Sequence, residues 1–338
     1  MKLATIRTAD GRTRAVRVDG DTLVDLGLAD VGELLAQPGW AEHAARADGG
    51  AVESAGFAPV VPRPGKIICI GLNYRRHILE MGRELPQYPT LFAKYPEALV
   101  GAYDEILLPP ESEQVDWEAE LAVVIGSRVR RATEAEADAA IAGFAVLNDV
   151  TMRDWQYRSP VWLQGKTWEA STPFGPYLVT PGDLPGGTRP SLTLTGWVDG
   201  EVVQQADTAD LVFDPVALVR YVSTILTLDP GDVIATGTPG GVGHARKPAR
   251  YLADGSVLAT EITGLGRSES RAVAEPAAEA ATGPAPAPAS GLASGVAGAP
   301  ASGPASGVAS APASGAASGV AAAPAAAPAA APAPGHTA

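Results

Sequence analysis

The C-terminal part of the chain has a composition that cannot support a packed core, and this limits where the folded part can lie. From Ala272 onward the sequence is almost entirely Ala, Pro, Gly and Ser, with near-repeats such as ASGLASGV and PASGAASGV. It contains no aromatic residue, and only Leu292 and a few valines could be buried. So little apolar surface cannot offset the entropy of ordering the backbone. We therefore expect residues 272–338 to form a disordered tail.

Short β-branched runs dominate the rest of the chain. Segments such as 120–126 (ELAVVIG) are typical of strands, whereas clear helical patterns such as 214–228 are few. Many strands with a minority of helices predict a mixed α+β fold rather than a doubly wound sheet. Residues 1–60 combine strand patterns, hairpin signals and a short helical piece, so we expect a small β-rich N-terminal subdomain before a main domain at 61–271.

Charge and cysteine content exclude several classes of protein. The net charge is −13, of which about −11 belongs to the first 271 residues, and this argues against nucleic-acid binding. The single cysteine, Cys69, lies in an apolar run and is predicted to be a core residue. No stretch approaches the roughly 18 apolar residues of a membrane span, and the first residues lack an apolar leader segment. We expect a cytoplasmic protein with no membrane partner.

Two glutamates open a strand-like apolar run. In VDWEAELAVVIG (115–126), Glu118 and Glu120 are two residues apart and therefore share one face of a strand. A solvated strand edge would accommodate them, and so would a cation. Asp149, at the end of a second apolar run, could complete a set of three oxygen ligands. Such a set suits Mg²⁺ or Mn²⁺ rather than zinc.

A histidine and a glutamate lie three residues apart in GLNYRRHILEMG (71–82). His77 and Glu80 would then occupy one face of a short helix. A carboxylate beside an imidazole raises its basicity, as a general base that activates water requires. A solvated helix face is the alternative interpretation of this pair.

Further candidate residues follow Asp149 along the chain. Arg153 and Gln156 could reach the same cavity, where Arg153 could hold a substrate carboxylate. Lys166, between two tryptophans, could bind an anion or stabilise an oxyanion, or could extend to solvent.

A glycine-rich loop follows a strand in GDVIATGTPGGVGHARKP (231–248). Thr236, Thr238 and backbone amides there could receive an anion, although such loops are also common as plain turns. We expect His244, just beyond it, to be structural or exposed rather than catalytic.

Taken together, these segments resemble the fumarylacetoacetate hydrolase family over about residues 60–267. The resemblance depends on ordered motifs: GLNYRRHILEM, LFAKYPEALVGAYDEILLP, VDWEAELAVVIG, NDVTMRDWQ, GKTWEASTPFGP, GDVIATGTPGGVG and KPARYLADGSVL. It is similar above all to family members of the acylpyruvase and oxaloacetate-tautomerase kind. The resemblance implies a β-roll core with flanking helices and a homodimer.

The resemblance also implies roles for individual residues. Glu118, Glu120 and Asp149 match the ligands of Mg²⁺ or Mn²⁺, and His77 with Glu80 matches a catalytic dyad on a mobile lid. The remaining matches are to positions that contact the substrate: Lys166, placed near the scissile bond, and Arg153, Gln156 and Thr238.

The implied chemistry is metal-dependent hydrolysis of a C–C bond in an acylpyruvate-like substrate, through a metal-bound enolate. The same site could instead tautomerise or decarboxylate oxaloacetate, or isomerise a hydroxymuconate. These oxo-acid reactions cannot be separated from the motifs alone. A non-catalytic metabolite-binding protein is the remaining alternative.

Overall fold

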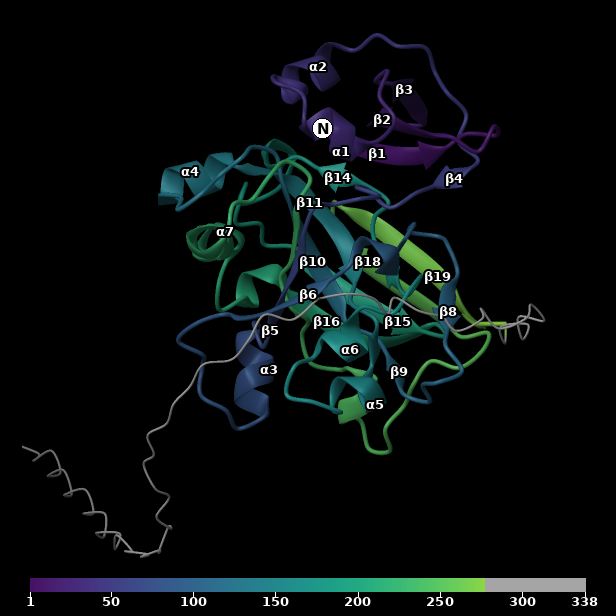
Figure 1. Cartoon of the computed structure of the whole chain (residues 1–338), viewed down its shortest axis with the longest axis vertical. Coiled ribbons are helices and arrows are strands. Elements are labelled where there is room, and N and C mark those ends of the chain that lie inside the picture. Colours follow the sequence, from purple (N-terminus) through teal and green to yellow (C-terminus); the bar gives the residue numbers. More distant parts are fainter. Residues whose placement is uncertain (277–338) are drawn as a thin grey trace, which may run out of the picture. The chain divides into compact units, whose positions relative to one another are not determined.

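The computed structural model describes residues 1–276 (Figure 1). Most of the predicted tail, residues 277–338, lies outside the described residues. Its predicted start at Ala272 falls inside a strand, because β19 (Gly266–Ala274) pairs with β8 (Ile106–Leu108) through Ala272, Val273 and Ala274. In this described part of the chain, no helix is long and apolar enough to cross a membrane.

A ten-stranded sheet forms the main framework. Its order is β3 (Thr22–Asp25), β2 (Thr13–Asp19), β1 (Lys2–Arg7), β14 (Leu178–Val179), β11 (Ile141–Asn148), β10 (Ala119–Ile125), β17 (Val233–Ala235), β5 (Ile67–Gly71) and β6 (Thr90–Lys94), with β4 (Gly56–Phe57) paired to β1. The N-terminal strands belong to this sheet, because Lys2 and Leu3 of β1 pair with β14. The expected boundary near residue 60 therefore marks no break in the sheet.

A five-stranded sheet packs beside this framework. Its order is β16 (Glu201–Asp207), β15 (Thr193–Val198), β18 (Val257–Ile262), β19 and β8. Two further pairs are β9 (Val115–Asp116) with β12 (Thr151–Met152), and β7 (Leu99–Val100) with β13 (Thr172–Pro173). The prediction of a mixed, largely β core is confirmed.

Helices are short, and side chains at their first residues explain where some of them begin. They are α1 (Val31–Leu35), α2 (Trp40–Arg46), α3 (Arg75–Glu80), α4 (Glu134–Ala139), α5 (Arg153–Gln156), α6 (Leu163–Lys166) and α7 (Pro215–Ile225), with 3₁₀ turns at Pro96–Ala98, Pro181–Asp183, Thr208–Asp210 and Gly243–Ala245. Asp214 caps α7 by accepting from the Ala217 N–H at 2.9 Å, and Pro215 occupies the first turn. Helices α4 and α7 lie side by side against the ten-stranded sheet (Figure 1).

The central strands β10 and β11 are buried along their whole lengths. Along β10, Leu121 and Val123 pack into the core cluster that contains α7, whereas Ala122 and Val124 pack into the cluster on the opposite face. Glu118 and Glu120 continue this second face by the period-two alternation of a strand. The glutamates are therefore directed into the protein rather than toward a solvated edge. Cys69 is buried in the same second cluster, as predicted.

Candidate active site

Three carboxylates converge where β10 begins and β11 ends. Glu118, Glu120 and Asp149 each offer an oxygen atom within 4.8 Å of the others. Their exposed fractions are 8%, 1% and 0%, so the alternative of a solvated strand edge is wrong. The Asp149 N–H donates to the Glu118 carbonyl at 2.8 Å, which holds the two strand ends together.

Two buried lysines neutralise part of this cluster. Lys166 Nζ donates to Glu118 Oε2 and to Asp149 Oδ2, both at 2.7 Å. Burial alone would lower the pKa of Lys166, but the charges of Asp149 and Glu118 outweigh it and raise the pKa. Lys166 therefore does not extend to solvent. Lys94 Nζ donates to Asp149 Oδ1 at 2.7 Å and to the Val150 carbonyl.

A buried arginine completes the cationic side of the cluster. Arg153 Nε donates to Asp116 Oδ2 at 2.8 Å, and Arg153 Nη1 lies 2.7 Å from Glu118 Oε1 and 2.9 Å from Gln156 Oε1. Gly165 allows α6 to approach α5 here, because a Cβ on it would lie 2.6 Å from the backbone of Gln156. Arg153 and Gln156 thus reach the cavity, as expected.

Glu120 is the carboxylate left without a cation. No ion pair to it occurs within residues 1–276, and its Oε2 accepts only from the Gly237 N–H at 2.8 Å. Burial, followed by the charges of Asp149 and Glu118, raises the pKa of Glu120 well above its ordinary value. Asp116 and the three converging residues give four buried carboxylates, and within residues 1–276 their ion pairs are with Lys94, Lys166 and Arg153 alone. This uncompensated charge and the all-oxygen donor set fit a divalent cation.

The residue between the two glutamates is held from both sides. Gln204 Oε1 accepts from the Ala119 N–H at 2.9 Å, and Thr238 Oγ1 donates to the Ala119 carbonyl at 2.9 Å. Gln204 Nε2 in turn donates to Thr238 Oγ1 and to the Pro239 carbonyl. Gln204 of β16 therefore holds the backbone between the two glutamates.

The glycine-rich loop binds carboxylates of the chain itself. Gly237 N–H donates to Glu120, and the amides of Gly243 and His244 donate to Asp116 at 2.7 and 3.0 Å. The expectation that Thr236 receives an external anion is wrong, because Thr236 is fully buried and donates its hydroxyl to the Leu121 carbonyl.

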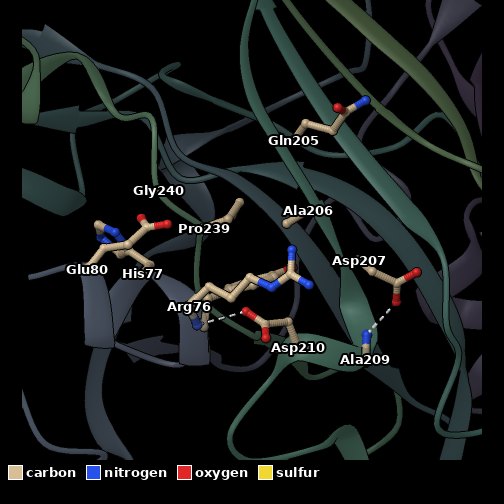
Figure 2. A pocket seen from close by; sticks show the side chains of 11 residues that line it. Arg76, His77, Glu80, Gln205, Ala206, Asp207, Ala209, Asp210, Pro239 and Gly240 are labelled. Carbon is tan, nitrogen blue, oxygen red and sulfur yellow. Dashed lines mark hydrogen bonds between the residues drawn. The ribbon is translucent and has the colours of Figure 1, made fainter.

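His77 and Glu80 lie on α3, where His77 lines two cavities and Glu80 lines one of them. A smaller cavity of about 250 Å³ contains Glu118, Lys166 and His77, and a larger one of about 480 Å³ contains His77 and Glu80. Figure 2 shows His77 and Glu80 close together beside Gly240, where a Cβ would lie 3.1 Å from His77 Nδ1 and 3.4 Å from Glu80 Oε2. Both residues therefore approach the glycine-rich loop.

The environment of His77 differs from the one expected from the sequence. Burial lowers its pKa below the ordinary value, and the charges of Glu80 and Glu118 only partly oppose this. The imidazole is therefore neutral at pH 7 and can accept a proton. Glu80 is exposed, whereas His77 is half-buried, so the interpretation of this pair as a fully solvated helix face is wrong for His77.

Three residues of the site were not predicted: Lys94, Asp116 and Gln204. Asp116 had a local signal, because it shares the period-two spacing of Glu118 and Glu120. Lys94 had a weaker signal, because it directly follows the apolar residues of β6. Gln204 had none, because its partner Ala119 is 85 residues away in sequence.

The fold and the site define an enzyme that acts on a small molecule in a cavity floored by buried carboxylates. The chain belongs to the fumarylacetoacetate hydrolase family, because residues 66–273 match the family described as Fumarylacetoacetate (FAA) hydrolase C-terminal.

Relatives of this chain are known by sequence and by structure. It is 44% identical over 211 residues to the mitochondrial oxaloacetate tautomerase Fahd2a of Rattus norvegicus, covering 62% of this chain and 67% of that protein. Fumarylacetoacetate hydrolase from Exiguobacterium antarcticum superposes with a TM-score of 0.70 at 31% identity, over 81% of this chain and 100% of that one. For 5-carboxymethyl-2-hydroxymuconate delta-isomerase from Mycobacterium smegmatis the TM-score is 0.67 at 31% identity, over 82% of this chain and 100% of that one.

Proposed function

We propose that this enzyme interconverts the keto and enol forms of a small 2-oxo acid, with oxaloacetate as the leading substrate. The observation that carries the proposal is a buried, cation-deficient carboxylate cluster whose Glu118 lines the same cavity as the neutral imidazole of His77. The curated relatives named as oxaloacetate tautomerases add support. They favour tautomerisation over C–C hydrolysis, and the hydroxymuconate isomerase favours a related proton shift.

Glu118, Glu120 and Asp149 are the residues that would hold the divalent cation, and we propose Mg²⁺ or Mn²⁺. A divalent ion bound there supplies Lewis-acid stabilisation of the negative charge that develops on a 2-oxo group. Lys94 and Lys166 offset the charges of Asp149 and Glu118, since Lys94 lies 2.7 Å from Asp149 and Lys166 lies 2.7 Å from both carboxylates.

His77 is the proposed base. Its neutral imidazole takes a proton from the carbon next to the 2-oxo group, and a proton returns to the oxygen when the enol forms. Glu80 stabilises the protonated imidazole through its charge. Lys166, at the floor of the cavity, offsets negative charge on the substrate.

The remaining cavity residues orient the substrate. Gln156 accepts from Arg153 through Oε1, so its amide nitrogen is the atom that can donate to a bound molecule. Arg153 and Thr238 line the same cavity, and we retain them as proposed substrate contacts.

Hydrolysis of an acylpyruvate is the second candidate function. It is favoured by the approach of His77 Nδ1 and Glu80 Oε2 to one point at Gly240, an arrangement that suits deprotonation of a water molecule. A homodimer and a cytoplasmic location remain predictions, and the tautomerases cited above are named mitochondrial.

Ultraviolet absorbance tests the proposal directly. Purified protein with Mg²⁺ is assayed for enol–keto equilibration of oxaloacetate and for release of pyruvate from acetylpyruvate, each repeated with EDTA. We expect EDTA-sensitive equilibration of oxaloacetate and no release of pyruvate. Release of pyruvate would establish the hydrolase instead, and silence on both substrates would support a metabolite-binding protein.

A further inference from the structure

The cations of the smaller cavity differ in what they already bind. The side chains of Arg83, Arg153 and Lys166 all line it, together with Glu118. A substrate carboxylate that does not bind the proposed metal ion would find its counter-charge among these three cations.

Arg153 and Lys166 are already paired with carboxylates of the chain. Arg153 is 4% exposed and bonded to Asp116 and Glu118, and Lys166 is 1% exposed and bonded to Glu118 and Asp149. Withdrawing either cation from these partners would leave a buried carboxylate uncompensated, which is costly. Their charge is therefore largely offset by the cluster, and less of it remains for a second substrate carboxylate than at an unpaired guanidinium.

Arg83 has no such partner. It lies three residues beyond the end of α3, where its N–H donates to the Ile78 carbonyl at 3.2 Å and anchors the backbone. Its side chain is exposed and makes no ion pair with any carboxylate of residues 1–276. Its charge nevertheless reaches the site, since after burial it is one of the charges that lower the pKa of His77.

We propose that Arg83 binds the second carboxylate of the substrate and thereby selects 2-oxo dicarboxylic acids over 2-oxo acids with a neutral end. The inference rests on the proposed function, because it assigns the first carboxylate and the oxo group to the cation that the carboxylate cluster would hold. A guanidinium presents paired N–H donors that match a carboxylate, and here they are uncommitted. A neutral acyl end would instead contact the apolar side of the cavity at Phe92 and Trp162.

Arg76 supplies a matched control. It also carries an exposed guanidinium, on α3 itself, but its side chain lines the larger cavity. Figure 2 shows it extending away from His77 toward the strand that carries Ala206. Removing the charge of Arg76 changes the net charge near α3 by the same amount as removing that of Arg83, but it leaves the lining of the smaller cavity unchanged.

The test compares R83Q, R83K and R76Q in the Mg²⁺-loaded protein. For R83Q we expect KM for oxaloacetate to rise about 10- to 100-fold with kcat nearly unchanged, which is the loss of a charge-assisted hydrogen bond. The inhibition constant of pyruvate, which has one carboxylate, should not change. R83K should recover part of the loss, and R76Q should behave as wild type.

Two results would overturn the proposal: an unchanged KM in R83Q, or an equal loss of oxaloacetate and pyruvate binding. If wild-type protein does not turn over oxaloacetate, the proposed function fails, and calorimetric dissociation constants for oxaloacetate and pyruvate still decide the role of Arg83. Selective weakening of oxaloacetate binding in R83Q would support that role even then.

Discussion

The carboxylate cluster and the α3 segment lie at the same cavity, which Glu118 and His77 both line, but they differ in burial and in bonding. In the cluster, Asp149 is fully buried and bonded to two lysines, and its neighbours on β10 are clamped through Gln204. On α3 and the residues after it, Glu80 and Arg83 are exposed and His77 is half-buried. The difference indicates that the sheet fixes the carboxylate cluster, whereas the α3 segment supplies the exposed groups of the proposed substrate site.

The largest effects are expected from substitutions in the carboxylate cluster, and stability should respond differently at Asp149 and at Glu120. Asp149→Asn leaves Lys94 and Lys166 short of a buried partner, so we expect turnover to vanish and the free energy of unfolding to fall by about 3–5 kcal/mol. Glu120→Gln removes a carboxylate that pairs with no lysine or arginine of residues 1–276, so the free energy of unfolding in EDTA should not fall. Because Glu120 is a proposed ligand, the same substitution should weaken Mg²⁺ binding more than about 100-fold.

Denaturant unfolding in EDTA and calorimetric Mg²⁺ titration measure these two quantities. Equal destabilisation by both substitutions would show that the lysines do not depend on Asp149. Unchanged Mg²⁺ affinity in Glu120→Gln would remove Glu120 from the cation site.

A smaller effect is expected on α3. His77→Ala should slow tautomerisation by about 10²- to 10⁴-fold, because the proton acceptor is lost. Mg²⁺ affinity and thermal stability should stay near wild type, since His77 is not part of the carboxylate cluster. Loss of Mg²⁺ binding in this variant would contradict the separation of the two regions.

The pH profile sharpens the assignment of His77. A base acts in its neutral form, so the rate falls as pH drops through its pKa, and burial places that pKa below the ordinary 6.5. We expect the acid limb of kcat/KM to lie below pH 6.5 and to disappear in His77→Ala. An acid limb above pH 6.5 would assign the limb to another group.

The smallest effect on stability and Mg²⁺ binding is expected from Gln204 on β16, and the neighbouring Gln205 provides the control. Gln204→Leu leaves the Ala119 N–H and the Pro239 carbonyl without a partner, which should cost about 1–3 kcal/mol of stability and weaken Mg²⁺ binding. Gln205→Leu is the control, because Gln205 is exposed and lines the larger cavity (Figure 2). Parallel unfolding curves and Mg²⁺ titrations should separate the two variants; identical behaviour would mean that the clamp on Ala119 does not position the glutamates.

The sequence predicts those features of the site that depend on residues close together along the chain. The alternation along β10 places Glu118 and Glu120 on one face, and the apolar run of β11 brings Asp149 to its end. The pairings that determine charge were not predictable, because they join distant segments. Lys94 and Asp149 are 55 residues apart, and no local pattern specifies that contact. Burial likewise changed the sign of the expected shift at His77, where the neighbouring carboxylates alone would have raised its pKa.

The attachment of α3 has a consequence for how such enzymes can diverge. The base of α3 is tied to the framework by Asn73, which bonds to Phe213 and to the Thr236 carbonyl, and by the Arg76 N–H to Asp210. The residues beyond α3 carry few such ties. Substitutions there can accumulate without disturbing the folding of the carboxylate cluster, so substrate preference can change during evolution while the cluster is kept.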